Sequence, residues 1–134
     1  MDGVKILWVS RHNPLPSQVK ELERKLGKIE IVQFAERVPN AEFVIELAKK
    51  HGAKIIVPVL PLSIIARLVE LANKEDITVL WAEMEQVKML YNPVPFQDYD
   101  PTIETVVAAG ESYKVMRFKR FHKIKAIRLE LEEW

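Results

Sequence analysis

The stretch VKILWV at Val4–Val9, followed by SRHNPLP at Ser10–Pro16, decides how this sequence is expected to fold. The first six residues form a nearly continuous apolar run, which is typical of a strand covered on both faces of a parallel sheet. The next stretch is polar and rich in proline, and Pro16 suits the first position of a helix. A strand, a loop and a helix are therefore predicted in this order.

This unit then repeats along the chain. Apolar residues recur at helical spacing after Pro16, Asn40 and Ser63, and the last two are of types that cap helices. Gly27 and Gly52 are expected to end the first two helices. Strands that alternate with helices predict an α/β fold, a Rossmann-like three-layer arrangement with a mostly parallel sheet. The predicted parallel strands, with the third near the middle, are Val4–Val9, Ile29–Phe34, Lys54–Val59 and Thr78–Trp81.

The pattern changes after Trp81. Residues 83–103 contain prolines and aromatic side chains and are predicted to form an irregular loop. Residues 104–134 are predicted to add C-terminal antiparallel strands, with a hairpin turn at Gly110-Glu111 and a last strand at Ile124–Leu131. Residues 1–134 thus read as a single domain, whose first 82 residues form a β-α-β-α-β-α-β core.

Composition narrows the class of protein. The chain has 134 residues, of which 49% are apolar and 29% charged, and its net charge is +1. It has no cysteine, no apparent secretory signal and no apolar run near the roughly 20 residues that span a bilayer, so a cytoplasmic protein without a membrane segment is expected. Abundant Lys, Glu and Arg beside few Gln and Asn favour a thermophilic source.

The first candidate ligand site is the loop formed by Ser10, Arg11, His12 and Asn13, which joins the first strand to the first helix. Ligands of open α/β sheets bind outside the carboxyl ends of the strands, where helix N-termini also favour anions. Arg11 would clamp a phosphate, His12 would serve as an acid, a base or a phosphate donor, and Ser10 would donate a hydrogen bond. The alternative is that Arg11 makes a surface ion pair while His12 and Asn13 satisfy the loop backbone.

A second candidate follows the third strand. Leu60 and Ser63 would complete the same pocket, although Ser63 is equally explained as an ordinary helix cap. Neither the glycine-rich dinucleotide fingerprint nor the phosphate loop of triphosphatases is present, so no cofactor is predicted. The three histidines are too far apart in sequence to form a helical metal pair, and no metal is predicted.

A third candidate is a basic stretch near the end of the chain. Between Lys114 and Arg128 there are seven Lys or Arg residues and no acidic residue, with Phe118 and Phe121 among them. Such a stretch would bind a phosphate backbone and stack on bases; alternatively, it is an outer strand whose lysines prevent edge-to-edge pairing. The residues that would contact nucleic acid are Arg117, Lys119, Arg120 and Lys123.

Three blocks carry a resemblance to known proteins: Ile6–His12 with Pro16-Ser17-Gln18, Val57–Leu62 and Arg117–Phe121. They resemble small uncharacterised Rossmann-like proteins of archaeal and bacterial viruses, plasmids and other mobile elements. The first two blocks are also similar to a small CRISPR-ancillary family related to the CARF-type, ring-nuclease-like domains. That superfamily senses or cleaves cyclic oligoadenylates, usually as a homodimer.

The resemblance implies that Ser10, Arg11 and His12 lie in the ligand loop and that Leu60 to Ser63 form the opposing wall. It identifies no nucleophile, so whether the protein is an enzyme stays open. Cleavage that uses the 2'-hydroxyl of the RNA itself would need only positioning and charge stabilisation from the protein.

Two classes of function follow. The first is a nucleotide- or oligonucleotide-binding domain, such as a CARF-like cyclic-oligoadenylate binder or a weak phosphodiesterase. The second is a non-catalytic accessory protein of a virus or plasmid that acts through its basic C-terminal face or through dimerisation. A homodimer is expected in which the segment Tyr91–Tyr99 or the apolar side of the last strands provides the contact surface.

Overall fold

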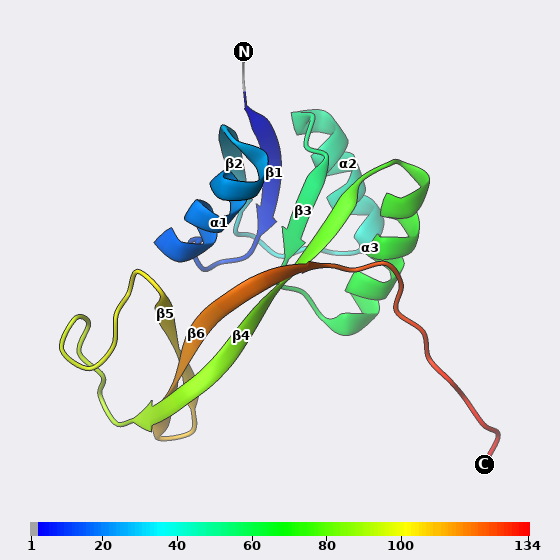
Figure 1. The fold of residues 1–134 in the computed structure, drawn as a ribbon. Coiled ribbons are helices and arrows are strands. Elements are labelled where there is room, and N and C mark those ends of the chain that lie inside the picture. Colours follow the sequence, from blue (N-terminus) through cyan, green and yellow to red (C-terminus); the bar gives the residue numbers. More distant parts are fainter. Residues whose placement is uncertain (1–2) are drawn as a thin grey trace.

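The computed structural model describes residues 3–134, which form an α/β fold with three helices and one sheet of six strands (Figure 1). The strand order is β2-β1-β3-β4-β6-β5. Strands β1 to β4 are mutually parallel, whereas β6 pairs antiparallel with β4 and β5 pairs antiparallel with β6, so the sheet is mixed. The elements are β1 Val4–Val9, α1 Pro16–Leu26, β2 Ile29–Phe34, α2 Ala41–His51, β3 Ile55–Pro58, α3 Leu62–Lys74, β4 Thr78–Leu90, β5 Glu104–Ala109 and β6 Ser112–Lys123.

The four predicted parallel strands are confirmed, and β3 lies between β1 and β4 as expected. Strands β1 and β2 have the predicted bounds, while β3 is one residue shorter at each end. None of the helices within residues 3–134 is both long and apolar enough to cross a bilayer.

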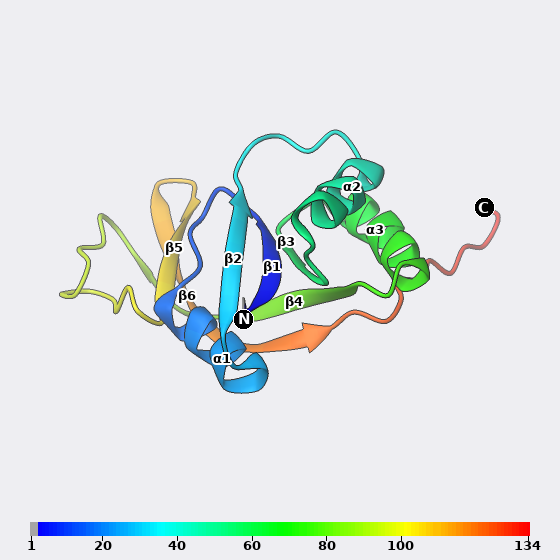
Figure 2. The ribbon, with the colours of Figure 1, turned by 90° about the horizontal axis from the view of Figure 1, so that it is seen from above.

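Helices cover both faces of the parallel part of the sheet. Because successive strand residues point to opposite faces, Leu7 and Val9 of β1 pack with the core formed by α2 and α3. Ile6 and Trp8 pack on the other face with Leu22 of α1. Figure 2 shows α2 and α3 side by side and α1 apart from them.

Strand β4 joins the two parts of the sheet. Its first residues pair with β3 through Thr78 and Val79, and the stretch from Leu80 to Leu90 pairs with β6. The β4-β6-β5 portion extends beyond the ends of the parallel strands, and we name it the arm (Figure 1). The prediction of an irregular loop over 83–103 is wrong for residues 83–90, which belong to β4. The register of β4 against β6 shifts at Glu83/Met84 and at Gln86/Lys88, and these shifts break the period of two that marks a strand in sequence.

The end of the chain also differs from the prediction. The hairpin turn at Gly110-Glu111 is confirmed, with Gly110 at φ 71. The strand predicted at Ile124–Leu131 is wrong, because residues 124–134 form no regular element. Their alternating pattern suits a strand, but β4 is already paired on both sides, with β3 and with β6. Leu129 and Leu131 consequently point into solvent, 79% and 87% exposed.

Helix ends follow the sequence signals with one exception. The Asn40 side chain accepts a hydrogen bond from the Phe43 N–H at 2.8 Å, Gly52 adopts the left-handed conformation after α2, and Pro16 is the first residue of α1. Ser63 is not the cap of α3, which begins at Leu62 after Pro61 and has no side-chain cap. The proline already sets an extended backbone before the helix, so the helix begins one residue before Ser63.

Candidate ligand-binding site

The candidate site lies where β1 and β3 end side by side. Val9 and Pro58, the last residues of these strands, are paired in register, and the Val59 N–H donates to the Val9 carbonyl at 2.8 Å. The loop at residues 10–13 and the segment at residues 59–60 therefore leave the same edge of the sheet together. This is the edge at which the sequence predicted a ligand.

The loop after β1 is held by hydrogen bonds within the loop and from side chains of β1 and β2. Ser10 is 7% exposed, and its Oγ accepts a hydrogen bond from the His12 N–H at 3.0 Å. The indole Nε1 of Trp8 donates to the His12 carbonyl, and the Gln33 amide donates to the Ser10 carbonyl at 3.1 Å. The loop backbone is thus fixed by side chains of β1 and β2, while the side chains of Arg11 and His12 are exposed.

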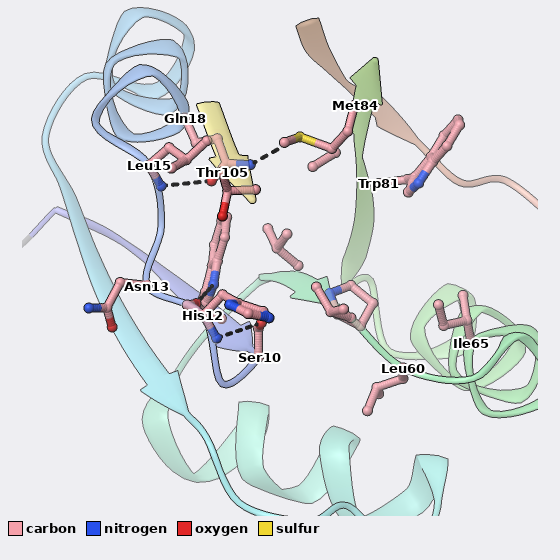
Figure 3. A pocket seen from close by; sticks show the side chains of 15 residues that line it. Ser10, His12, Asn13, Leu15, Gln18, Leu60, Ile65, Trp81, Met84 and Thr105 are labelled. Carbon is pink, nitrogen blue, oxygen red and sulfur yellow. Dashed lines mark hydrogen bonds between the residues drawn. The ribbon is translucent and has the colours of Figure 1, made fainter. Parts of the chain in front are cut away.

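A pocket of about 320 Å³ opens beside this loop on the side of α1, and we name it the apolar pocket (Figure 3). Its walls come from the loop after β1, the start of α1, the end of β3, the middle of β4 and one residue of β5. A mostly apolar lining with a few polar groups is typical of small-molecule sites. The lining residues are Trp8, Ser10, His12, Asn13, Leu15, Gln18, Val57, Pro58, Val59, Leu60, Ile65, Trp81, Ala82, Met84 and Thr105.

Trp81 lies at the edge of this pocket, and in Figure 3 its ring points away from Gln18 and Met84. Its side chain is half-exposed and stacks on His122 of β6, with ring centroids 5.6 Å apart and an interplanar angle of 29°. The His122 Nε2 lies 2.6 Å from the Glu83 Oε1. This hydrogen bond lowers the pKa of the Glu83 carboxyl below its ordinary value, against an opposing effect of burial. The Trp81 ring is therefore supported from behind by a hydrogen-bonded pair.

A second pocket of about 500 Å³ lies at the carboxyl ends of β1, β2 and β3, and we name it the charged pocket. It contains Arg11 and Arg37 together with Glu36. Among the ion pairs within residues 3–134, none involves Arg11 or Arg37. The lining residues are Val9, Ser10, Arg11, His12, Phe34, Ala35, Glu36, Arg37, Val38, Pro39, Val59, Leu60, Pro61 and Ile64.

The two pockets meet at four shared residues, which are Ser10, His12, Val59 and Leu60. Of the other predicted ligand residues, Arg11 lines only the charged pocket and Asn13 only the apolar pocket. Ser63 lines neither, since it is exposed on the first turn of α3. The structure thus brings together all the predicted ligand residues except this serine.

Several lining residues were not found from the sequence. Arg37 follows β2, and the rule that strand ends share an edge could have identified it. Gln18, Trp81 and Thr105 carry no comparable signal, because each reaches the apolar pocket through the tertiary arrangement of α1, β4 and β5.

The basic stretch is partly neutralised by neighbouring strands. Arg117 pairs with the buried Glu104 at 2.9 Å, and Lys119 pairs with Glu85 at 3.5 Å. Arg120 and Lys123 have no ion pair within the described residues. The interpretation of this stretch as an outer strand holds only in part: β5 covers β6 over Ser112–Arg117, whereas the part of β6 with Lys119, Arg120 and Lys123 pairs with β4 alone.

The aromatic residues of β6 pack inward. The rings of Phe118 and Phe121 lie 4.9 Å apart, and Phe121 meets Trp8 edge-on at 6.5 Å. These two side chains are therefore engaged in packing, and neither lines the apolar or the charged pocket.

For the part of the chain that is described, no group of three or more His, Asp or Glu side chains is placed to hold a metal ion. Comparisons with models of protein families, with curated proteins and with solved structures found no match. The chemistry of the two pockets is therefore the basis for assigning a function.

Proposed function

We propose that this protein is a cytoplasmic nucleotide- or oligonucleotide-binding domain whose ligand spans the apolar pocket and the charged pocket. The observation that carries the proposal is that two pockets of opposite chemistry share Ser10, His12, Val59 and Leu60. A nucleotide joins a flat, largely apolar base to an anionic phosphate, so it matches both pockets at once.

Each pocket offers the contacts that one part of a nucleotide needs. Arg11 and Arg37 provide guanidinium groups that bind phosphate through paired hydrogen bonds, and no carboxylate within the described residues occupies them. The half-exposed Trp81 ring provides a stacking surface for the base. The phosphate is thus assigned to the charged pocket and the base to the apolar pocket.

The fold supports a Rossmann-like assignment. The parallel order β2-β1-β3-β4 has helices on both faces, and the chain moves to opposite sides of β1 when it forms β2 and β3. Ligands of doubly wound sheets bind where the strand order reverses in this way. In the CARF-like version of the proposal, the ligand is a cyclic oligoadenylate that two copies of the chain bind together.

Binding is favoured over catalysis. His12 is the only His, Asp, Glu, Lys or Arg that lines both pockets. Within the described residues, no hydrogen bond or ion pair joins its imidazole to a carboxylate that would orient it as a base. We therefore propose phosphodiester cleavage only as a slow accessory activity that relies on the ligand's own 2'-hydroxyl.

The proposal is tested by thermal unfolding in the presence of AMP, a cyclic tetra-adenylate, ribose 5-phosphate and inorganic phosphate. A ligand at 100 times its dissociation constant should stabilise the protein by about 2.7 kcal/mol. We expect stabilisation by the two nucleotides and a smaller effect of ribose 5-phosphate. An unchanged melting temperature with all four compounds at millimolar concentration would refute the proposal.

A second candidate function, that of an accessory protein acting through self-association, rests on exposed apolar side chains. Tyr91 and Phe96, in the loop between β4 and β5, are 75% and 79% exposed, and Leu129 and Leu131 near the end of the chain are similarly exposed. Light scattering at micromolar concentration distinguishes a dimer from a particle of 15.5 kDa, the mass of one chain. A monomer at all concentrations would exclude this function and the homodimer with it.

A further inference from the structure

The side-chain amide of Gln18 is buried in the wall of the apolar pocket. Gln18 lies on the first turn of α1 and is 5% exposed, and in Figure 3 it lies between Leu15 and Met84. A buried amide normally satisfies its donors and its acceptor within the protein. Its hydrogen bonds therefore indicate whether this side chain only stabilises the fold or is also available to bind a ligand.

The orientation of the amide is fixed by the start of the helix. The Leu15 N–H donates a hydrogen bond of 2.8 Å to the Gln18 side chain. Only the oxygen of an amide can accept this bond, so Oε1 faces Leu15 and Nε2 faces the other way. The acceptor of Gln18 is thus used to stabilise the first turn of α1.

Within residues 3–134, the donor of Gln18 has no strong partner. Its Nε2 lies 3.8 Å from the Met84 Sδ, and a thioether sulfur is a weak acceptor. An amide nitrogen carries two N–H groups, and a buried donor without a good acceptor costs free energy that a ligand would recover. The Ser10 hydroxyl, which accepts from His12 N–H, likewise donates to no acceptor within the described residues.

We propose that Gln18 Nε2 determines base specificity by donating a hydrogen bond to an acceptor atom on the edge of a planar heteroaromatic ring held in the apolar pocket. This inference rests on the proposed nucleotide-binding function. The pocket lining contains no Asp, Glu, Lys or Arg, so the ring is neutral and is read by hydrogen bonds. A ring that presents a donor at this position places its own N–H group against the N–H group of Gln18, and this repulsion excludes it.

The substitution Gln18→Glu tests this inference because it replaces the donor and keeps the acceptor for Leu15. The matched variant Gln18→Met keeps the length of the side chain and removes both. Wild type and both variants are titrated calorimetrically at about pH 7.5 with AMP, GMP, CMP, UMP and ribose 5-phosphate. Circular dichroism melts of each variant confirm that the fold is retained.

We expect Gln18→Glu to weaken the best-bound nucleotide about tenfold, the effect of one hydrogen bond, and to change which nucleotide binds best. Gln18→Met should weaken the same nucleotide and reduce the differences in affinity among the four nucleotides, and ribose 5-phosphate should bind equally to all three proteins. The inference is overturned if Gln18→Glu keeps both the affinity and the order of the wild type. If wild type binds neither the nucleotides nor ribose 5-phosphate, the proposed function fails as well.

Discussion

The indole N–H of Trp8 donates a hydrogen bond of 3.0 Å to the backbone carbonyl of His12. Trp8 is 3% exposed in the sheet, so a core side chain directly holds the loop that separates the two pockets. The replacement Trp8→Phe removes the donor and keeps an aromatic ring. We expect the free energy of unfolding to fall by about 1–3 kcal/mol and ligand affinity to fall with it, as measured by urea titration and calorimetry.

If the affinity of Trp8→Phe for AMP equals that of the wild type while its stability falls, the loop does not depend on this bond. Phe121→Leu is the matched control, since Phe121 packs against Trp8 but lines neither pocket. It should lower stability with less effect on binding.

The phosphate assignment is tested by removing cations in two places. Arg11→Ala and Arg37→Ala should each weaken AMP binding at least about tenfold, because each removes a charge-assisted donor from the charged pocket. The double variant Lys119→Ala with Arg120→Ala on β6 should bind within about twofold of the wild type.

The opposite pattern would place binding on the arm. In that case the double variant Arg11→Ala with His12→Ala would keep the affinity of the wild type, and the β6 double variant would lose it. Affinity would also fall steeply with salt, and the slope of log affinity against log salt concentration would shrink by about one for each phosphate contact removed.

Trp81 should contribute stacking energy that depends on the base. A stacked base is typically worth about 1–3 kcal/mol, so Trp81→Ala should weaken AMP about five- to hundredfold and leave ribose 5-phosphate unchanged. Trp134→Ala is the control, because this tryptophan is fully exposed and distant in sequence from the pocket. Equal losses in the two variants, measured by calorimetry, would contradict the role of Trp81.

The parallel half of the sheet could be predicted because its local signals agree with one another. Apolar runs form the strands, and the helix between two strands is marked by a capping residue such as Asn40 and a terminating glycine such as Gly52. The arm could not be predicted fully, because two register shifts in β4 hide its period. The alternating residues from Ile127 to Leu131 misled in the opposite direction, because alternation does not itself supply a partner strand, and β4, which the tail contacts at Ile124, is already paired on both sides.

Part of the candidate site could be predicted from the sequence as well. The loop at Ser10–Asn13 was predicted from the rule that ligands bind at strand ends. Gln18 and Met84, by contrast, are 66 residues apart and meet only because the arm folds back towards α1. A local reading of the sequence contains no information on such a contact.

The core and the tail should respond differently to the same substitution. Leu68 of α3 is fully buried, so Leu68→Ala should lower the free energy of unfolding by about 2–5 kcal/mol. Leu129→Ala should change it by less than about 0.5 kcal/mol, because this side chain is exposed. Chemical denaturation at low micromolar concentration measures both values. A large loss for Leu129→Ala would show that the tail is packed, within the chain or against a second copy.

Acid should loosen the segment before β5 through Asp100. Hydrogen bonds from the Thr102 hydroxyl and backbone N–H lower the pKa of Asp100 below its ordinary value of 3.8. The resulting stabilisation is present above about pH 3.8 and is lost as the pH falls through the lower, folded-state pKa. Hydrogen exchange at the Thr102 amide should therefore lose protection in acid. Asp100→Asn should show little of this pH dependence; an identical acid response in the variant would assign the effect to other groups.

The apolar pocket is completed late in synthesis, because β4 and β5 follow the other elements that line it along the chain. The chain leaves the ribosome from its N-terminus, so β1, α1 and β3 are available long before Met84 and Thr105. The apolar pocket needs all of these, and Trp81 gains its support only when His122 has been added. A nascent chain that already displays Ser10 and Arg11 still lacks the opposite wall. On the proposed function, ligand binding in the apolar pocket is therefore restricted to chains that already contain β4 and β5.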